Sequence, residues 1–510
     1  MARLHEYQGK AILSKLGIPV PRGWAATSET ETADIARELG VPVVIKIQAY
    51  TTGRAAIGGI ALAATADQAR SNARRMLGMR VGRFAVTHLL VEEQLSIASE
   101  VFVSFAIDER ERAPVLLIGA VGGSGVEGRS EQVRRLACDV RTGPRESDLA
   151  RVASELTSSG EIRAKLAAVL RRVCEIARQI DARSLEINPL AITTDARVVA
   201  ADCRVTIDDY AVFRHPELGI DFAREFDHPP TPLERVAYAV EQADHRGTFY
   251  FAQMAAAAES GSRGLVGFHG AGGGGSMMAM DAITTEGFAV ANFADTSGNP
   301  SSAKVYRAAR IILSQPGLVG YFGSGSGVAS QEQFWSAYGL AKAFWEVNLD
   351  VPAVIRLGGN TEDRAVDILC SACKELPARV EGYRKTDSPR AIAHRLAELV
   401  EAGGGRTWTP RTRRVPRFVG SSDSVSYAIL GGRVWIDAAR WSTMKAAAIT
   451  NSAGLLRDDH GRPALAVSEA ELARKDSELI ACEVECRRIG MDAVFVDMDI
   501  PGLAEAAGRA

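Results

Sequence analysis

The chain has 510 residues, and because compact domains usually hold about 100–200 residues, this length predicts two to four domains. Hydrophobic residues make up 46% and charged residues 24% of the sequence, which excludes a mainly disordered, collagen-like or coiled-coil chain. With 60 basic and 62 acidic residues, the charge balance provides no reason to expect nucleic acid or an anionic membrane as the main partner.

The cysteine content and the N-terminus bear on the compartment. Seven cysteines are too few and too scattered for a disulfide framework, which favours a reducing environment. The first ten residues carry charges and no apolar run, so we expect no signal peptide. The longest uncharged stretches, Gly264–Met280 and Ile311–Gln331, are too polar to span a bilayer. We therefore expect a cytoplasmic protein with no membrane partner.

From residue 1 to residue 225, short β-branched runs alternate with helical apolar patterns, which predicts a mixed α and β domain. The expected strands are Val41–Gln48, His88–Glu92, Val101–Ile107 and Val115–Gly119, and the expected helices are Glu31–Leu39 and Glu161–Ile180. The segment Phe226–Pro232 contains three prolines, which disfavour both a helix and a central strand. We place a domain boundary there.

From residue 240 to residue 402, strands end in glycine-rich turns that lead into helices. The expected strands are Gly264–His269, Gly317–Phe322 and Ala353–Leu357. This order is typical of an open parallel sheet, which binds ligands at the carboxyl ends of its strands, and we expect a flavodoxin-like domain. Residues 403–416 are rich in Gly, Pro and Arg without periodicity, which predicts a solvated linker before a last domain over 417–510.

Lys46 lies inside an apolar strand, and a lysine buried there needs an anionic partner to offset the loss of hydration. A nucleotide phosphate would serve, and Gly53 and Arg54 follow in a loop that could approach the same phosphates. The alternative is a lysine at a strand end whose ammonium reaches water.

Glu186, Asn188 and Asp202 form the strongest polar cluster in the sequence. They come from Leu185–Pro189 and Val198–Asp202, which could be neighbouring strands. Carboxylate and amide oxygens are hard ligands that suit magnesium, together with phosphate oxygens and water. Glu186 lies two residues before Asn188 and so on the same strand face. The alternative is an exposed hairpin with polar residues.

Three motifs carry a family resemblance: LHEYQGKAILSKLGIPVPRG near the N-terminus, the Lys46 strand with its Gly-Arg loop, and SLEINPL. Over residues 1–400 the chain resembles the β subunit of succinyl-CoA synthetase. The resemblance implies an α/β multidomain protein with an ATP-grasp domain over 1–225, followed by the flavodoxin-like domain. It also implies a ligase that uses ATP or GTP and Mg²⁺ to form a CoA thioester from a small carboxylic acid. CoA and a phosphorylatable histidine would come from an α-type partner subunit in a hetero-oligomer.

The same resemblance assigns roles to individual residues. It implies nucleotide contacts from Lys46, Gly53, Arg54, Ala55, Glu92, Leu95 and Glu100, and metal ligation by Asn188 and Asp202. It implies catalytic roles for Lys46 and Arg54 on the phosphates, and for Glu186 in receiving the partner's phosphohistidine. The sequence departs from the family at Ala56, where a second lysine is usual.

The acid site departs further from the family pattern. The resemblance places the acid near His269 and near Gly327, Val328 and Ala329. His269 replaces an asparagine, and the glycine-rich loop that ends at Ala329 lacks an arginine that could pair with a carboxylate. We therefore expect an acid other than succinate and a contact between it and His269, although a lone histidine is more often structural.

Residues 417–510 resemble a degenerate two-cluster bacterial ferredoxin with two short hairpins and two helices, a small α+β domain. Cys482 and Cys486 are two of the eight thiolates that two clusters need, so we expect no iron–sulfur cluster. The alternative is a pair of ordinary buried cysteines one turn apart on one helix.

Two other functions stay open. The chain could be a CoA-independent ATP-grasp ligase that joins a carboxylate to an amine. It could also be a non-catalytic protein that docks a partner through its ferredoxin-like tail. Retention of Lys46, Glu186, Asn188 and Asp202 together favours a working nucleotide site and hence the acid–CoA ligase.

Overall fold

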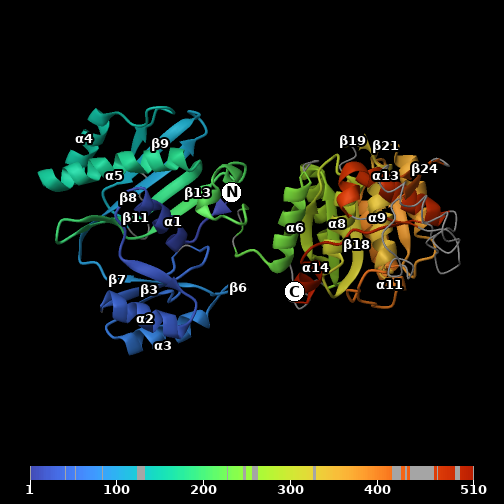
Figure 1. Cartoon of the computed structure of the whole chain (residues 1–510), viewed down its shortest axis with the longest axis horizontal. Helices are drawn as coiled ribbons and strands as arrows, with labels where there is room; N and C mark the ends of the chain where they lie inside the picture. Colours follow the sequence, from blue (N-terminus) through green and yellow to red (C-terminus); the bar gives the residue numbers. More distant parts are fainter. Residues whose placement is uncertain are drawn as a thin grey trace, which may run out of the picture. The chain divides into compact units, whose positions relative to one another are not determined.

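The chain forms two compact units in a computed structural model, Met1–Pro230 and Thr231–Ala510 (Figure 1). The division falls inside the proline-rich segment predicted as a boundary. None of the helices among the described residues is long and apolar enough to cross a membrane. The structure describes residues 2–40, 42–51, 53–82, 84–122, 133–224, 226, 228–244, 248–254, 262–325, 329–415, 427–430, 433–436, 465–467, 469–488 and 494–508.

The first unit contains a large antiparallel sheet in the order β1-β13-β11-β8-β9-β10, with β12 paired to β11. Its strands are β1 (Ala2–Arg3), β8 (Ile97–Asp108), β9 (Ala113–Gly119), β10 (Val133–Ala137), β11 (Ala182–Thr193), β12 (Val198–Ala200) and β13 (Cys203–Ile207). The helices of this half of the unit are α4 (Glu146–Leu156) and α5 (Gly160–Gln179), and two 3₁₀ turns, Val212–Arg214 and Pro216–Leu218, follow β13. The pairing of β11 with β12 and β13 confirms the predicted neighbouring strands.

A smaller antiparallel sheet in the same unit has the order β2-β7-β3-β4. Its strands are β2 (Gly23–Ala26), β3 (Val43–Ile47), β4 (Ile60–Ala63) and β7 (Leu89–Glu93), and a separate short pair is β5 (Arg80–Val81) with β6 (Phe84–Ala85). Alternate residues of β3 point to one face, where Val43, Ile45 and Ile47 pack in a core with α2 (Glu29–Leu39) and α3 (Ala66–Leu77). The opposite face therefore carries Lys46.

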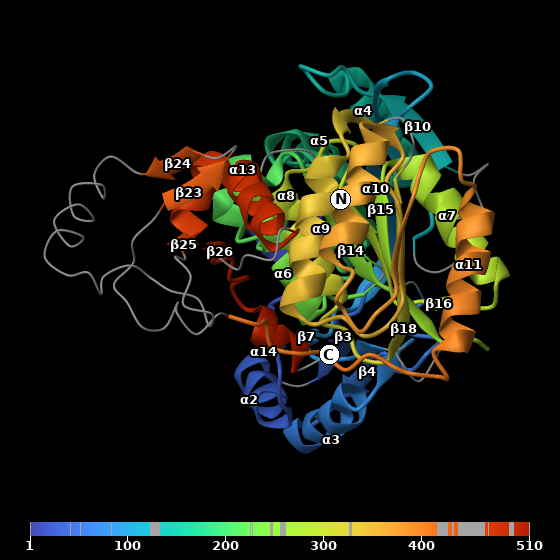
Figure 2. The ribbon, with the colours of Figure 1, turned by 90° about the vertical axis from the view of Figure 1, so that its right-hand side faces the viewer.

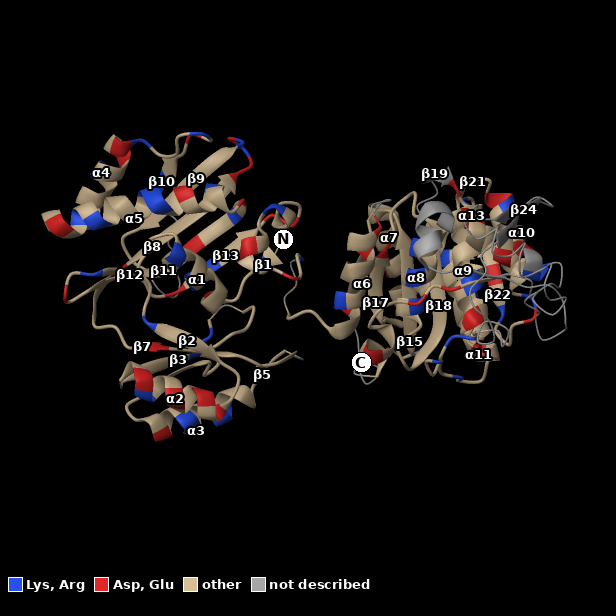
Figure 3. Ribbon diagram, in the orientation of Figure 1, with Lys and Arg blue, Asp and Glu red and all other residues tan. Residues whose placement is uncertain are grey.

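Helix α1 (Glu6–Lys15) packs beside β13. Its residues Glu6 and Lys10 are separated by four positions and so lie on one helix face. Both side chains are buried, at 5% and 4% exposure, which requires partners for their charges. In the view of Figure 3, basic and acidic residues are interspersed along the outer helices α2 to α5.

The second unit is built on a mainly parallel sheet in the order β14-β17-β15-β18-β20-β22, with β16 beside β15 and only β14 antiparallel. Its strands are β14 (Tyr250–Gln253), β15 (Leu265–Ala271), β16 (Ala289–Val290), β17 (Asn292–Asp295), β18 (Leu318–Gly325), β20 (Ala353–Arg356) and β22 (Val380–Tyr383). A short parallel pair is β19 (Ala329–Glu332) with β21 (Gly359–Asn360). The predicted parallel sheet is confirmed.

Helices cover both faces of this sheet (Figure 2). One face carries α7 (Gly273–Thr285) and α11 (Pro389–Ala402), and the other carries α6 (Pro232–Ala243), α8 (Ser302–Ile312), α9 (Phe334–Glu346) and α10 (Glu362–Ala372). Thr231 begins α6 as its N-cap, because its hydroxyl accepts from the Glu234 N–H while the Glu234 carboxylate accepts from the Thr231 N–H.

The stretch 403–416, predicted as a solvated linker, is mostly exposed among its described residues, with Trp408 as the exception. Trp408 is buried at 1% exposure, and its indole N–H donates to the Leu313 carbonyl oxygen at 2.6 Å. A tryptophan buries a large apolar area and needs a partner for its N–H, and both conditions are met on the second unit. Trp408 therefore anchors this otherwise mostly exposed stretch to the second unit.

Described parts of the chain after residue 417 also pack on the second unit. Helix α13 (Glu469–Arg488) lies against α9, and Ile480, Cys482 and Val496 belong to the same apolar core. A buried tail cluster joins them: Lys342 of α9 contacts Glu346 and, at 2.7 Å, Glu483 of α13, and Arg487 contacts Glu483. The predicted separate last domain is thus corrected for these residues.

The ferredoxin-like fold of the tail stays a prediction, because most of 417–464 lies outside the described residues. The described elements are β23 (Tyr427–Leu430), β24 (Arg433–Ile436), β25 (Leu465–Val467), β26 (Val494–Val496) and α14 (Leu503–Ala507). β23 and β24 form a hairpin, but β25 and β26 are parallel and joined by α13, so they form no hairpin with each other. Cys482 is buried in an apolar core, and the side chain of Cys486 lies outside the described residues.

Candidate active site

The Glu6 carboxylate is the hub of a buried charge cluster in the first unit. Three cations contact it: the ammonium groups of Lys10 and Lys46, both at 2.8 Å, and the Arg54 guanidinium at 2.6 Å. The Glu6 side chain is only 3% exposed. Because these cations come from a helix, a strand and a loop, one acidic residue holds three segments of the chain together.

A second carboxylate, that of Glu92 on β7, binds the two lysines. Its oxygens lie 2.6 Å from Lys10 Nζ and 2.9 Å from Lys46 Nζ. Both lysines also donate to the carbonyl oxygen of Ala201, at 2.8 Å and 2.7 Å. Lys46 is therefore buried as predicted, but its partners in the structure are protein oxygens. Glu92 points into the cluster, where its carboxylate binds both lysines, and its predicted nucleotide contact stays a prediction.

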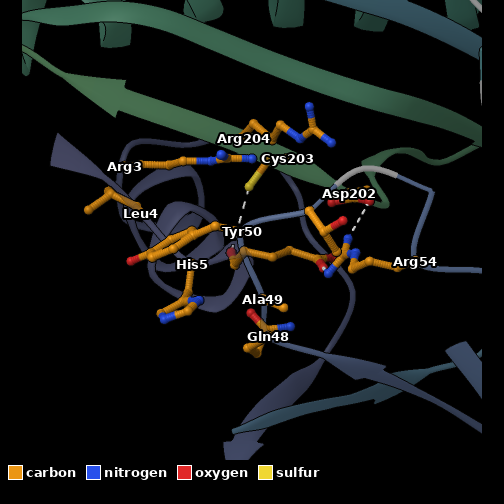
Figure 4. Close-up of a pocket in the computed structure, with 12 residues that line it drawn as sticks. Arg3, Leu4, His5, Gln48, Ala49, Tyr50, Arg54, Asp202, Cys203 and Arg204 are labelled. Carbon is orange, nitrogen blue, oxygen red and sulfur yellow. Dashed lines mark hydrogen bonds and ion pairs between the residues drawn. The ribbon is translucent and has the colours of Figure 1, made fainter. Parts of the chain in front are cut away.

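Arg54 connects this hub to Asp202 (Figure 4). One guanidinium nitrogen contacts Glu6 at 2.6 Å and the other contacts Asp202 at 2.6 Å. The Asp202 side chain is 30% exposed and the Arg54 side chain 11%, so this pair is the edge of the cluster that reaches water. We call Glu6, Lys10, Lys46, Arg54, Glu92 and Asp202 the phosphate-site cluster.

Electrostatics explain how six charges coexist there. Burial by itself would raise the pKa of Glu6, but Lys46, Lys10 and Arg54 outweigh it and hold that pKa well below its usual range. Burial would lower the pKa of Lys46, but Glu6 and Glu92 raise it. The pKa of Asp202 is raised, because burial and the neighbouring Glu6 charge outweigh Arg54 and Lys46. Lys46 thus stays charged, and Asp202 is a carboxylate whose charge would be stabilised by an additional cation.

The loop that carries Arg54 is open to solvent. Gly53 has φ 64°, a left-handed conformation that favours glycine, and a Cβ there would meet nothing within 4 Å. Ala55 and Ala56 are exposed, so no side chain of this part of the loop is buried in the cluster except that of Arg54. The structure therefore brings Arg54 to Lys46 and leaves Gly53 and Ala55 on the outer side of the loop.

Asn188 and Asp202 lie beside each other on β11 and just before β13. The Asn188 N–H donates to the Asp202 carbonyl oxygen at 3.2 Å, and both residues are half-buried. An amide oxygen and a carboxylate at the edge of a cleft fit a magnesium ion that takes its other ligands from phosphates and water. Among the described residues, no group of three or more His, Cys, Asp or Glu side chains could hold a metal ion.

The remaining predicted residues of the first unit lie along the same region. Glu186 is half-buried on β11 and pairs across the sheet with Arg204 of β13 and Ser104 of β8. Leu95 follows β7, and Glu100 of β8 pairs with Ala191. On the Lys46 face of the small sheet, Ile60 and Leu62 of β4 are 37% and 59% exposed, which leaves an apolar surface beside the lysine.

The acid site predicted in the second unit is only partly described. His269 lies on β15 with 6% exposure, and its ring nitrogens contact the hydroxyl groups of Tyr321 at 2.7 Å and Thr296 at 3.1 Å. Burial lowers its pKa to about 4. Both ring nitrogens are thus engaged by protein, and a substrate contact would require one of these bonds to open. Gly327 and Val328 lie outside the described residues, and Ala329 begins β19.

The carboxyl ends of β15 and β18 nevertheless form a polar edge. Gly270 is paired with Ser324, whose buried hydroxyl has no hydrogen-bond partner within the described part of the chain. Asp295 accepts from the N–H groups of Gly272 and Ser297, at 3.0 Å and 2.7 Å, which orders the glycine-rich turn before α7. Sequence reasoning did not identify Ser324 as a candidate.

Sequence reasoning also missed Glu6 and Lys10. Their signal was available, because a glutamate and a lysine four positions apart lie on one face of a helix. That spacing usually marks an exposed surface pair, and neither residue was weighed as part of the site. Only their burial in the folded unit distinguishes them from an ordinary surface pair.

Comparisons with known proteins identify the type of domain and the family. The family model of the ATP-grasp domain matches residues 3–192. The succinate–CoA ligase (GDP-forming) β subunit of Thermus thermophilus is 33% identical over 371 residues, which cover 72% of this chain and 93% of that protein. The ADP-forming counterpart from Bacteroides thetaiotaomicron is 32% identical over 376 residues, covering 72% and 94%.

Among solved structures, ATP citrate lyase from Methanothrix soehngenii has a similar fold, with a TM-score of 0.64 and 18% identity over 78% of this chain and 99% of that chain. The fold and the buried cations define an ATP-grasp domain of a ligase. The chain belongs to the family of succinate–CoA ligase β subunits.

Proposed function

We propose that the chain is the nucleotide-binding subunit of an acid–CoA ligase that activates a carboxylic acid other than succinate. ATP or GTP would supply a phosphate to a histidine of an α-type partner subunit. Transfer of that phosphate to the acid would give an acyl phosphate, and CoA held by the partner would displace it. A hetero-oligomer of the two subunits is part of this proposal.

The observation that carries the proposal is the convergence of Lys46 and Arg54 beside Asn188 and Asp202. Transfer of a phosphoryl group needs mainly positioning and neutralisation of charge. Lys46 and Arg54 would hold the phosphates, and the oxygens of Asn188 and Asp202 would hold Mg²⁺. A bound Mg²⁺ would polarise the phosphate oxygens and offset their charge.

The outer parts of the site would bind the rest of the nucleotide and the partner. Gly53 and Ala55 would contribute loop backbone N–H groups, and the segment from Glu92 to Glu100, including Leu95, would border the base and ribose. The apolar surface at Ile60 and Leu62 supports a base site, because a purine face is apolar and gains from burial. Glu186, on the same strand face as Asn188, would receive the partner's phosphohistidine.

The second unit would hold the acid. Its strands run β17-β15-β18-β20-β22, the 2-1-3-4-5 order of flavodoxin-like sheets, where ligands bind at the carboxyl ends beside the order reversal. The buried hydroxyl of Ser324 and the N-terminus of α7 lie at that edge. A carboxylate or acyl phosphate accepts hydrogen bonds from such groups. The loop around Gly327, Val328 and Ala329 would complete the acid site, and His269 would contact the acid.

A panel of carboxylic acids tests the proposal. Release of nucleoside diphosphate is measured for each acid with the full chain, CoA and a candidate partner subunit. We expect release that requires CoA, the partner and one class of acid, and that falls in a Lys46→Met variant but not in Lys15→Met, an exposed lysine of the same unit. No release with any acid would contradict the ligase, and release with an amine in place of CoA would favour the CoA-independent alternative.

A further inference from the structure

Arg54 occupies the carboxylate that the proposed function assigns to the metal. Its guanidinium lies 2.6 Å from Asp202 Oδ2, and the same side chain reaches Glu6 at 2.6 Å and the Ile47 carbonyl oxygen at 3.1 Å. Figure 4 shows the guanidinium directed at Asp202. A divalent cation and a guanidinium on one carboxylate repel each other, so they compete for Asp202.

The cluster can lose Arg54 without leaving Glu6 unpaired. Glu6 keeps Lys10 and Lys46, both at 2.8 Å, when the guanidinium moves. Within the described part of the chain Asp202 makes no second direct ion pair, because Lys46 and Lys10 donate to Glu6, Glu92 and the Ala201 carbonyl oxygen. Departure of Arg54 would thus leave a half-buried carboxylate in need of a cation.

The space beside Arg54 is small, and movement of its guanidinium away from Asp202 would enlarge it. The cleft lined by Arg54, Asp202 and Gln48 has a volume of about 30 Å³, enough for a water molecule but not for a chain of phosphates. The loop can supply that movement, because it carries a left-handed Gly53 and the exposed Ala55 and Ala56. Phosphate oxygens bind a guanidinium in two places at once and so compete well for it.

We propose that Arg54 is the counter-ion of Asp202 in the nucleotide-free protein and exchanges Asp202 for phosphate when a nucleotide binds. A divalent cation then binds Asp202 tightly only together with the nucleotide, which couples the two binding events. This coupling rests on the proposed function of Asn188 and Asp202 as metal ligands. It gives Arg54 a second role, as a residue that keeps the metal site closed until phosphate arrives.

The test measures Mn²⁺ binding to the nucleotide-free full chain by electron paramagnetic resonance, with no turnover. Arg54→Met removes the charge, and we expect it to tighten Mn²⁺ binding at least about tenfold. Arg54→Lys keeps a positive charge and should stay close to the wild type. A second change, Asp202→Asn in the Arg54→Met protein, should abolish the gain. Damage to the fold cannot produce tighter binding, so the expected gain is specific.

The matched control is Arg74→Met, an exposed arginine of the same unit whose partner is Glu29, and it should leave Mn²⁺ binding unchanged. Equal Mn²⁺ affinity of the wild type and Arg54→Met would overturn the counter-ion exchange. Nucleotide binding by the wild type, measured separately by calorimetry, tests the proposed function. A gain of Mn²⁺ binding without any nucleotide binding would support Arg54 as the counter-ion of Asp202 but contradict the nucleotide site, so the two failures are distinguishable.

Discussion

Each unit of the molecule contains a buried cluster of charges, and the two clusters differ at their edges. In the tail cluster, the side chains of Lys342, Glu346 and Glu483 are all 0% exposed. The phosphate-site cluster is equally well paired at Glu6 but ends at Asp202, whose side chain is 30% exposed. The tail cluster is fully buried, and the phosphate-site cluster opens at a glycine-containing loop.

The surroundings of the two lysines show what the difference means. The Lys342 ammonium lies over the rings of Tyr306 and Phe495, at 5.2 Å and 5.0 Å, and its side chain is fully buried among the described residues. Lys46 lies beside a loop and a cleft. Burial of paired charges is therefore not by itself a sign of catalysis. An edge at which one pair can exchange for a ligand distinguishes the functional cluster.

Removing the lysine of the sealed cluster should have the largest effect on stability. Lys342→Met leaves Glu346 and Glu483 without their shared cation, and breaking a buried pair costs about 3–5 kcal/mol. Urea unfolding should show this loss, with nucleotide affinity unchanged. Lys374→Met, an exposed lysine of the same unit, should be near neutral. A near-neutral Lys342→Met would show that the tail cluster contributes little.

The equivalent change in the open cluster should act on the ligand. Lys46→Met removes a cation from the phosphates, and truncating one partner of a buried charge pair costs about 2–5 kcal/mol, or at least a 30-fold weaker Kd. Unfolding should be affected less than in Lys342→Met, because the Lys46 side chain is 11% exposed and its cluster reaches water at Asp202, whereas Lys342 is fully buried. Calorimetry with ATP measures the Kd. If Lys46→Met left the Kd for ATP unchanged, the phosphate-site cluster would have no role in nucleotide binding to distinguish it from the tail cluster.

Lowering the pH should remove the contribution of the Glu6 carboxylate to stability. The folded-state pKa of Glu6 lies well below the usual value of 4.5, so its stabilisation is present above that value and is lost as pH falls through the lower, folded-state pKa. Glu6→Gln should cost about 2 kcal/mol at pH 7, within the range for hydrogen bonds to charged groups, and progressively less below pH 4.5. Unfolding across this pH range tests the sign. A cost that grows with acidity would contradict the assignment.

Breaking an exposed ion pair should have the smallest effect on the free energy of unfolding, and it serves as the reference for the buried pairs. Arg74 is 73% exposed and lies 2.8 Å from Glu29. Because water screens such pairs, Arg74→Met should change the free energy of unfolding by less than about 1 kcal/mol. Raising the salt concentration should reduce even this difference, whereas the cost of Lys342→Met should persist. If Arg74→Met lowered the free energy of unfolding more than Lys46→Met does, the expected difference between buried and exposed pairs would be contradicted.

Much of the fold follows from local patterns. The apolar strands around Lys46 and Leu185, the helix of residues 161–180 and the parallel strands ending in glycine are each visible in the sequence. The acidic and amide oxygens at Asn188 and Asp202 could be identified for the same reason, since neighbouring strands were predicted and are observed. The tail could not be placed, because nothing in its composition reveals that Glu483 meets Lys342, 141 positions away.

The sequence by itself determined the class of the fold, the family and the candidate phosphate and metal residues, because periodicity and motif spacing are local properties. Tertiary structure alone decided the partners of those residues. It buries Glu6 and Lys10 of the first helix against Lys46 and Glu92, which lie 40 and 82 positions away from them, and closes Asp202 with Arg54. The role of a charged residue depends on its surroundings in the folded protein. In this molecule the surroundings distinguish the Arg54–Asp202 pair, which reaches water, from the Lys342–Glu483 pair, which is fully buried.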